Sequence, residues 1–130
     1  MASILVVDDS FASRNATAAL LRADGHRVTC ADNAWRGLTI LESMPIDLVV
    51  LDLVLPGLNG FGFLKDIQQN RRLHGMPVIV ASALEVNPEL WAQCQPQVKQ
   101  WLLKGKYAGD ELLEAVNSAL PAMRPVTSAA

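Results

Sequence analysis

The fold is decided by the stretch Ile46-Asp47-Leu48-Val49-Val50-Leu51, which Asp52 follows directly. This run is short, rich in β-branched residues and apolar on both faces, which is typical of a central strand in a parallel sheet. Turn-forming glycine, proline and asparagine residues fill the next segment, 52–60, and favour a loop there. The stretch therefore predicts a buried strand over 46–51 that ends in a carboxylate beside a loop.

Short apolar runs and segments of helical spacing alternate along the whole chain. Such alternation implies a parallel sheet with helices on both faces, and right-handed crossovers favour the flavodoxin-like, doubly wound strand order 2-1-3-4-5. We therefore predict an α/β fold with five strands and five helices. The predicted strands span 4–7, 26–30, 46–51, 77–81 and 98–103, and the predicted helices begin at Ser10, Asn33, Phe61, Asn87 and shortly before Leu112.

Length and composition fit one domain. The chain has 130 residues, of which 51% are hydrophobic and 18% charged, enough for one core without a disulfide or structural metal. We assign residues 1–120 to this domain and 121–130 to a C-terminal tail or the start of a linker. The net charge of −2 argues against a basic nucleic-acid surface, and we find neither a signal peptide nor an apolar run of membrane-spanning length. We expect a cytoplasmic protein that contacts neither nucleic acid nor a membrane.

Several single residues have ordinary explanations. Cys30 and Cys94 lack the spacing of a zinc site and are expected to be buried free thiols. His26 and His74 show no partner pattern and are expected at the surface. Trp35 is expected to pack beside its helix or to be a partly exposed surface aromatic.

Polar side chains follow four of the five predicted strands. Asp8 and Asp9 follow the first, Asp52 the third, Ser82 the fourth and Lys104 the fifth. Each alone has an ordinary explanation as a cap, a turn residue or a solvated charge, but the fold would bring all five to one edge of the sheet. Carboxylates about 4 Å apart repel one another by roughly 1–4 kcal/mol per pair, so such a cluster destabilises the fold unless a cation is bound.

The ligand types indicate which cation and which chemistry. Carboxylate and carbonyl oxygens suit Mg²⁺, with Mn²⁺ as an alternative, and no histidine or cysteine lies nearby in sequence to favour zinc. A divalent ion, a lysine and a hydroxyl around one carboxylate form a site for an incoming phosphoryl group. The remaining carboxylate can then act as a nucleophile and become an acyl phosphate.

Four motifs resemble the receiver domains of two-component response regulators, particularly the chemotaxis regulators. They are ILVVDDS, LDLVLPGLNG, VIVAS and WLLKG, which begin at Ile4, Leu51, Val78 and Trp101. The resemblance covers about residues 3–120. It implies a signalling domain that is not an enzyme, except that it catalyses its own phosphorylation and dephosphorylation.

The resemblance also implies roles for the polar residues. Asp52 would accept a phosphoryl group from a histidine of a sensor kinase or a phosphotransfer protein. Asp8, Asp9, Asp52 and the backbone carbonyl of Val54 would hold Mg²⁺, Asp9 more directly than Asp8. Lys104 would pair with the phosphoryl group.

A switch is implied as well. Ser82 would be its hydroxyl and Trp101 its aromatic residue. The signal would be read on the face of the fourth helix, fifth strand and fifth helix by a downstream effector protein or an output domain, and the same face could support a dimer. Trp91 and Tyr107 lie in that stretch and fit an aromatic contact patch, although Trp91 could equally be a core residue of its short helix.

The chain departs from the family at one position near the site. The family usually has Lys-Pro with a cis peptide that orients the lysine, whereas this chain has Lys104-Gly105. We expect this bond to be trans or mobile, since a non-proline cis bond costs about 2.5–4 kcal/mol. Lys106 is then a second candidate for the role of Lys104. The indole of Trp101 is also larger than the usual ring and is not expected to turn inward easily.

The residues beside the acceptor are apolar or small. Val54 and Leu84 flank the acceptor and switch positions, where polar residues in the family can position a hydrolytic water. We therefore predict a long-lived phosphorylated state. Ala83 is small, as is common in the family, and leaves access to the acceptor.

Two other functions compete with this hypothesis. The chain could be a pseudo-receiver that binds a partner without phosphorylation, which Gly105 favours and the complete set of polar residues opposes. It could also be a small flavin-binding electron carrier of similar topology. That function needs a phosphate-binding loop after the first strand, where Asp8 and Asp9 would repel a phosphate.

Overall fold

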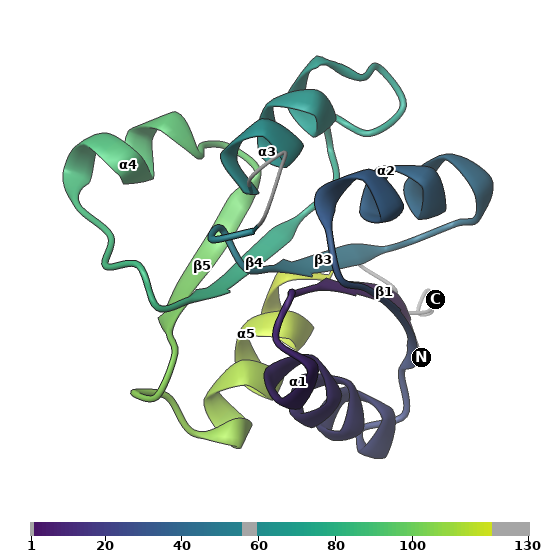
Figure 1. Ribbon diagram of the computed structural model, residues 1–130, viewed down its shortest axis with the longest axis vertical. Coiled ribbons are helices and arrows are strands. Elements are labelled where there is room, and N and C mark those ends of the chain that lie inside the picture. The colour runs from purple at the N-terminus through teal and green to yellow at the C-terminus, as the bar shows by residue number, and fades with distance from the viewer. Residues whose placement is uncertain (1, 56–59, 121–130) are drawn as a thin grey trace, which may run out of the picture.

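A computed structural model describes residues 2–55 and 60–120 of the chain (Figure 1). In this part, five parallel strands form one sheet in the order β2-β1-β3-β4-β5, with five helices around it, so the predicted α/β fold is confirmed. The elements are β1 Ser3–Val7, α1 Phe11–Ala23, β2 Arg27–Ala31, α2 Ala34–Ser43, β3 Leu48–Leu51, α3 Gly60–Gln69, β4 Val78–Ser82, α4 Pro88–Gln93, β5 Val98–Leu103 and α5 Gly109–Ala119.

Side-chain caps begin three of the helices where the sequence predicts them. Ser10, Asn33 and Asn87 each accept a hydrogen bond from the backbone N–H three residues later, which satisfies a donor that the helix itself cannot pair. Gly25 follows α1 with a φ of 92°, the left-handed conformation expected there. The predicted strand over 46–51 is shorter than expected, because β3 begins at Leu48.

The sheet separates two apolar clusters. On one face, Val7, Leu51 and Val80 pack with helices α2 and α3, and on the other, Val6, Val50 and Ile79 pack with α1 and α5. Figure 1 shows these two pairs of helices on opposite sides of the sheet. Because successive strand side chains point to opposite faces, strands that are apolar throughout supply both clusters. This burial on both faces fixes the strand register that places the polar residues at the strand ends.

The prediction for His26 is wrong. Its side chain is only 6% exposed; its Nδ1 accepts a hydrogen bond from the backbone N–H of Ala2, and its Nε2 lies 3.0 Å from Oδ1 of Asn117. These partners are 24 and 91 positions away, so no local pattern could reveal them. His74 is exposed, as predicted.

Other single-residue predictions have mixed outcomes. Cys94 is buried as predicted, but Cys30 is only half-buried. Trp35 is 59% exposed, which agrees with a surface aromatic. Trp91 is 37% exposed and α4 has no buried residue, so the alternative of a core tryptophan is wrong. Because α4 has only six residues, it presents too few side chains on one face to bury Trp91 in the core.

Two predictions concern residues outside the described part. The proposed loop over 52–60 is described only at its ends, and the proposed tail over 121–130 is not described. Among the residues that are described, none of the helices has the length and hydropathy needed to cross a membrane.

Candidate functional site

Backbone hydrogen bonds bring the carboxyl ends of the strands together. The N–H of Asp8 donates to Ala31 at the end of β2, and the N–H of Asp52 donates to Val7 at the end of β1. The N–H of Lys104 donates to the carbonyl of Ser82 over 2.8 Å, which joins the ends of β5 and β4. These polar residues therefore lie along one edge of the sheet, as the strand order requires.

Three carboxylates meet at this edge. Asp8, Asp9 and Asp52 each offer an oxygen atom that lies within 4.8 Å of the other two. Asp8 and Asp52 are buried, and Asp9 is exposed to solvent. Oxygen donors of this kind fit a hard divalent ion such as Mg²⁺, and the exposed member leaves the cluster accessible from solvent.

Lys104 links two of the carboxylates. Its Nζ lies 2.8 Å from Oδ2 of Asp52 and 3.0 Å from Oδ2 of Asp8. Burial alone would lower the pKa of Lys104, but its hydrogen bonds to Asp52 and Asp8, with their charges, outweigh burial and raise it. The lysine is therefore protonated at neutral pH and offsets part of the repulsion within the cluster.

Gly105 directs the chain without a proline. It has a φ of 81°, a left-handed conformation that glycine adopts without steric cost, and Lys106 then closes a turn by donating its N–H to the carbonyl of Leu103. Lys104 thus reaches the carboxylates despite the departure from the family pattern. Lys106 is exposed, and no ion pair joins it to the cluster in residues 2–55 and 60–120.

Asp8 is held in place by the start of α1. Its Oδ1 accepts the N–H of Ser10 at 2.9 Å, and its Oδ2 accepts the hydroxyl of Ser13 at 2.6 Å. Arg14 also donates from its guanidinium to the backbone carbonyl of Asp8. Sequence reasoning missed Ser13 and Arg14, although a serine and an arginine within five residues of Asp9 were a visible signal. Asp8 therefore has a fixed orientation.

The backbone after Asp52 packs directly against α3. Oδ1 of Asp52 accepts the N–H of Val54 at 3.0 Å, and the N–H of Gly60 donates to the carbonyl of Leu53. A Cβ atom on Gly60 would lie 2.4 Å from Cα of Leu53, so only glycine permits this approach. The sequence indicated Gly60 only as a turn residue, whereas in the structure it allows α3 to pack against the backbone that follows β3.

The two proposed switch residues meet at Leu84. The hydroxyl oxygen of Ser82, a fully buried residue, accepts the N–H of Leu84. The indole Nε1 of Trp101 donates to the carbonyl of Leu84 over 2.9 Å. The indole is half-buried and packs against the cluster that faces α2 and α3.

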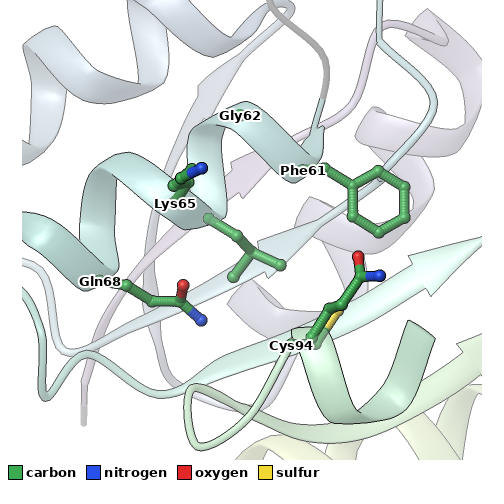
Figure 2. Close-up of a pocket in the computed structure, with 7 residues that line it drawn as sticks. Phe61, Gly62, Lys65, Gln68 and Cys94 are labelled. Atoms are coloured by element: carbon green, nitrogen blue, oxygen red, sulfur yellow. The ribbon is translucent and has the colours of Figure 1, made fainter. Parts of the chain in front are cut away.

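A separate cavity of about 430 Å³ lies between α3 and α4 (Figure 2). Apolar side chains of Phe61, Leu64 and Cys94 line it together with amide and amine groups, and burial raises the pKa of the Cys94 thiol. None of the proposed phosphorylation residues lines this cavity. The residues for which the sequence predicts phosphoryl chemistry therefore lie at the carboxyl ends of the strands and not in this cavity.

Comparison with known proteins settles the family. The family described as the response regulator receiver domain matches residues 4–117. The chain belongs to this family. Receiver domains are signalling modules of two-component systems, so the resemblance inferred from the four motifs is confirmed.

Two relatives show how much of the chain is shared. PilH of Pseudomonas aeruginosa is 31% identical over 121 residues, which cover 92% of this chain and 98% of that protein. The response regulator RR06 of Streptococcus pneumoniae is 43% identical over 82 residues, which cover 63% of this chain but only 36% of that protein. Receiver domains of this kind therefore occur both in proteins of this length and in longer ones.

Solved structures share the fold. The chemotaxis protein CheY4 of Vibrio cholerae superimposes with a TM-score of 0.84 at 25% identity, covering 92% of this chain and 99% of the CheY4 chain. The response regulator TrrA of Thermotoga maritima, solved in complex with Mg²⁺ and beryllium fluoride, gives a TM-score of 0.78 at 28% identity, covering 92% and 100%. This receiver domain thus has the fold of these regulators and an acidic cluster suited to a metal.

Proposed function

We propose that this receiver domain is a phosphorylation-dependent switch. It accepts a phosphoryl group on Asp52 from a histidine of a sensor kinase or a phosphotransfer protein, in a reaction that depends on Mg²⁺. The observation that carries the proposal is the contact of Lys104 with Asp52 inside a cluster of three carboxylates. A buried acid with a paired ammonium beside a cation site is what phosphoryl transfer to a carboxylate requires.

The residues present fit a divalent ion. In the proposal Asp9, Asp52 and the backbone carbonyl of Val54 hold Mg²⁺, or Mn²⁺ in its place, and Asp8 contributes from its fixed position. When bound, the ion neutralises negative charge on the phosphoryl oxygens. Asp9 is exposed and therefore accessible to a hydrated ion, whereas the oxygens of Asp8 already accept several hydrogen bonds.

The transfer step is a displacement at phosphorus. A carboxylate oxygen of Asp52 attacks the phosphorus atom of the phosphohistidine, and the imidazole leaves with the electrons of the broken N–P bond. Lys104 pairs with charge on the transferred group, and the hydroxyl of Ser82 donates to one of its oxygens. The product is an acyl phosphate that carries about two negative charges where the carboxylate carried one.

The added charge shifts a conformational equilibrium. Moving a population from 1:99 to 99:1 requires about 5.5 kcal/mol of differential binding. Hydrogen bonds to charged groups contribute roughly 1.5–3 kcal/mol each, so new bonds from Ser82 and Lys104 are sufficient. A hydroxyl of Ser82 that turns toward the phosphate would release the N–H of Leu84, whose carbonyl accepts the indole N–H of Trp101.

The proposed output is a protein contact in the cytoplasm. The face formed by α4, β5 and α5 would bind a downstream effector protein or an output domain, or would form a dimer. Trp91 and Val86 are exposed on the α4 side of this face and suit such a contact. Val54 and Leu84 remain our reason to expect a long-lived phosphorylated state, since neither side chain can orient a water molecule.

Phosphorylation by acetyl phosphate tests the assignment of Asp52. The chain is incubated with acetyl phosphate and Mg²⁺, and intact mass is measured for the wild type and for Asp52→Asn. We expect one added phosphoryl group on the wild type, none on Asp52→Asn and none when Mg²⁺ is chelated. Asp66→Asn, which removes an exposed carboxylate from α3, is the matched control and should react like the wild type. A phosphoryl group on both the wild type and Asp52→Asn, or on neither of them, would overturn the proposal.

Beryllium fluoride distinguishes the switch from a pseudo-receiver. Gly105 favours a pseudo-receiver because it removes the proline that usually orients the lysine. Beryllium fluoride with Mg²⁺ mimics the acyl phosphate and should change the tryptophan fluorescence, since the indole of Trp101 is bonded to Leu84 beside Ser82. If neither the fluorescence nor the NMR spectrum of the protein changes, the result would favour a pseudo-receiver that binds its partner without phosphorylation.

A further inference from the structure

We propose that the cavity between α3 and α4 is a binding site for a small molecule that joins an apolar body to a single carboxylate, such as a fatty acid of medium chain length. The inference goes beyond the proposed function, because this cavity and the carboxylate cluster share no residue. The cavity measures about 430 Å³, and clefts of about 300–1,000 Å³ are typical of small-molecule sites.

The inner wall of the cavity is apolar. Leu64 on α3 is 3% exposed, and Cys94, the residue after α4, is fully buried. Phe61 is half-buried and packs against the same core cluster as these two residues. Burial raises the pKa of the Cys94 thiol, so this group is uncharged at neutral pH and behaves as a small apolar side chain. The inner wall therefore suits a hydrocarbon group and excludes a fully hydrated anion.

Polar groups line the more exposed part of the cavity. Lys65 contributes an ammonium group, and Gln68 and Gln93 contribute side-chain amides. In the described part of the chain, Lys65 forms no ion pair and neither amide forms a side-chain hydrogen bond. Figure 2 shows Lys65 and Gln68 on α3, with Cys94 on the opposite side of the cavity. Three polar side chains are thus available to a ligand.

The charge of the lining indicates the head group of the ligand. Among the described residues that line the cavity, Lys65 is the only charged one, so it matches a single negative charge. A phosphate carries up to two charges and is best recognised by bidentate arginine, which this lining does not contain. The amides of Gln68 and Gln93 offer N–H donors to a carboxylate oxygen that the lysine leaves unpaired. A carboxylate on an apolar body therefore matches the cavity in both charge and polarity.

The two helices beside the cavity are held to different degrees. The start of α3 is fixed, because the N–H of Gly60 donates to the carbonyl of Leu53 and a Cβ atom on Gly60 would collide with Leu53. By contrast, α4 has six residues and none of them is buried. A ligand between the helices would hold α4 against α3. Because α4 belongs to the proposed output face, such a ligand would act as an effector of that face.

Two matched probes test the site. Octanoate and octanamide have the same apolar body and differ in the carboxylate. Each is titrated into the ¹⁵N-labelled chain, below the concentration at which octanoate forms micelles, and binding is followed by the NMR signals of the backbone amides. Octanoate should bind saturably and shift the signals of α3 and α4. Octanamide should bind about three- to tenfold more weakly, as expected for the loss of one partly exposed charged contact.

A substitution at Lys65 isolates the contribution of its charge. Lys65→Met keeps a long apolar stem without the ammonium group. It should weaken octanoate by the same three- to tenfold and leave the affinity for octanamide unchanged. Lys99→Met is the matched control, because Lys99 is exposed, does not line the cavity and donates to the carbonyl of Pro96. This control should bind octanoate as the wild type does.

A substitution at Cys94 tests the apolar wall. Cys94→Leu adds carbon atoms to the inner wall and should weaken octanoate and octanamide alike, because both need the same space. Lys65 is an exposed side chain, so Lys65→Met keeps the test decisive even where Cys94→Leu does not fold.

Several results would overturn the inference. These are octanoate that does not bind saturably, equal affinities for octanoate and octanamide, an unchanged octanoate affinity in Lys65→Met, and shifted signals that lie outside α3 and α4. The titrations contain neither Mg²⁺ nor a phosphodonor. Failure of Asp52 to accept a phosphoryl group would therefore leave their outcome unchanged.

Discussion

The two ends of the carboxylate site are held in different ways. At the β1 end, Asp8 accepts hydrogen bonds from Ser10 and Ser13, and its carbonyl accepts one from Arg14. At the β4 and β5 end, Ser82 accepts one longer hydrogen bond, 3.3 Å from the N–H of Leu84, and the chain then passes through exposed residues. The first end is rigidly bound to α1. The second is lightly held at the Ser82 hydroxyl, although Lys104 beside it is bonded to Ser82, Asp8 and Asp52.

This difference indicates which end of the site can change conformation when a phosphoryl group adds charge at Asp52. A new phosphoryl group meets a fixed carboxylate on one side and adjustable groups on the other. Population shifts need an element with two arrangements of similar energy, and the lightly held end is the suitable one. Substitutions at the β1 end should therefore mainly change stability and metal binding, whereas those at the β4 and β5 end should mainly change the response to phosphorylation.

The largest effect on stability is expected at the rigid end. Ser13→Ala removes the 2.6 Å hydrogen bond to Asp8 and leaves a buried carboxylate with one donor fewer. Bonds to charged groups contribute about 1.5–3 kcal/mol, so the free energy of unfolding in urea should fall by that amount. Ser43→Ala is the control, because the exposed Ser43 hydroxyl donates to a helix carbonyl away from the site. Equal stability of the two variants would mean that the β1 end is not rigidly held by α1.

A smaller loss is expected at the lightly held end. Gly105→Ala places a side chain on a residue with a φ of 81°, which costs roughly 1–2 kcal/mol for an L-residue. Urea unfolding should show this loss, and the phosphorylation rate should fall because Lys104 moves. Gly75→Ala is the matched control, since a Cβ atom there meets nothing within 4 Å and no positive φ opposes it. An unchanged phosphorylation rate in Gly105→Ala would show that this conformation does not orient the lysine.

The same contrast explains what the sequence could predict. The strand order and the meeting of Asp8, Asp52 and Lys104 follow from alternating apolar runs, because parallel strands carry the residues at their ends to one edge. Gly60 was recognisable as a turn residue, but its close approach to Leu53 depends on how α3 is seated and has no local signal. The order of apolar runs along the sequence therefore predicts which polar side chains meet at the edge of the sheet. Only the packed structure shows how firmly each of these side chains is held.

Contacts between distant residues were the least predictable. His26 lies beside Asn117 near the end of α5, and the side-chain amide of Asn117 donates a hydrogen bond to Asp24 at the end of α1. Each of these side chains taken alone is compatible with an exposed position. A single sequence indicates which residues are polar, but the pairing of two polar residues across a sheet face depends on the packed helices between them.

A stabilising substitution would sharpen the contrast between the two adjacent aspartates. Asp9 is exposed beside two buried carboxylates, so Asp9→Asn relieves repulsion and should raise the stability of the metal-free protein by less than about 1 kcal/mol. The same variant should lose the stabilisation that Mg²⁺ gives to the wild type, measured as the change in melting temperature with added Mg²⁺. A full Mg²⁺ response in Asp9→Asn would remove Asp9 from the proposed ligand set.

The smallest effect is expected at alkaline pH, where the two ends are linked through Lys104. Hydrogen bonds to Asp52 and Asp8 outweigh burial and raise the pKa of Lys104, and burial raises the pKa of Tyr107. As pH rises, the unfolded chain therefore loses the protons of Lys104 and Tyr107 at a lower pH than the folded chain does. The contribution of both groups to stability is complete near neutral pH, and it should decline as pH rises beyond about 10, the ordinary pKa of tyrosine and nearly that of lysine.

Urea unfolding at several pH values between about 9 and 11 measures this decline. The slope of unfolding free energy against pH should be shallower in Lys104→Met and in Tyr107→Phe than in the wild type, because each variant lacks one of the two groups. Lys99→Met removes an exposed lysine outside the site and should keep the wild-type slope. Equal slopes in all four proteins would show that neither group binds its proton more tightly in the folded chain, and the link between the two ends would then lack its electrostatic component.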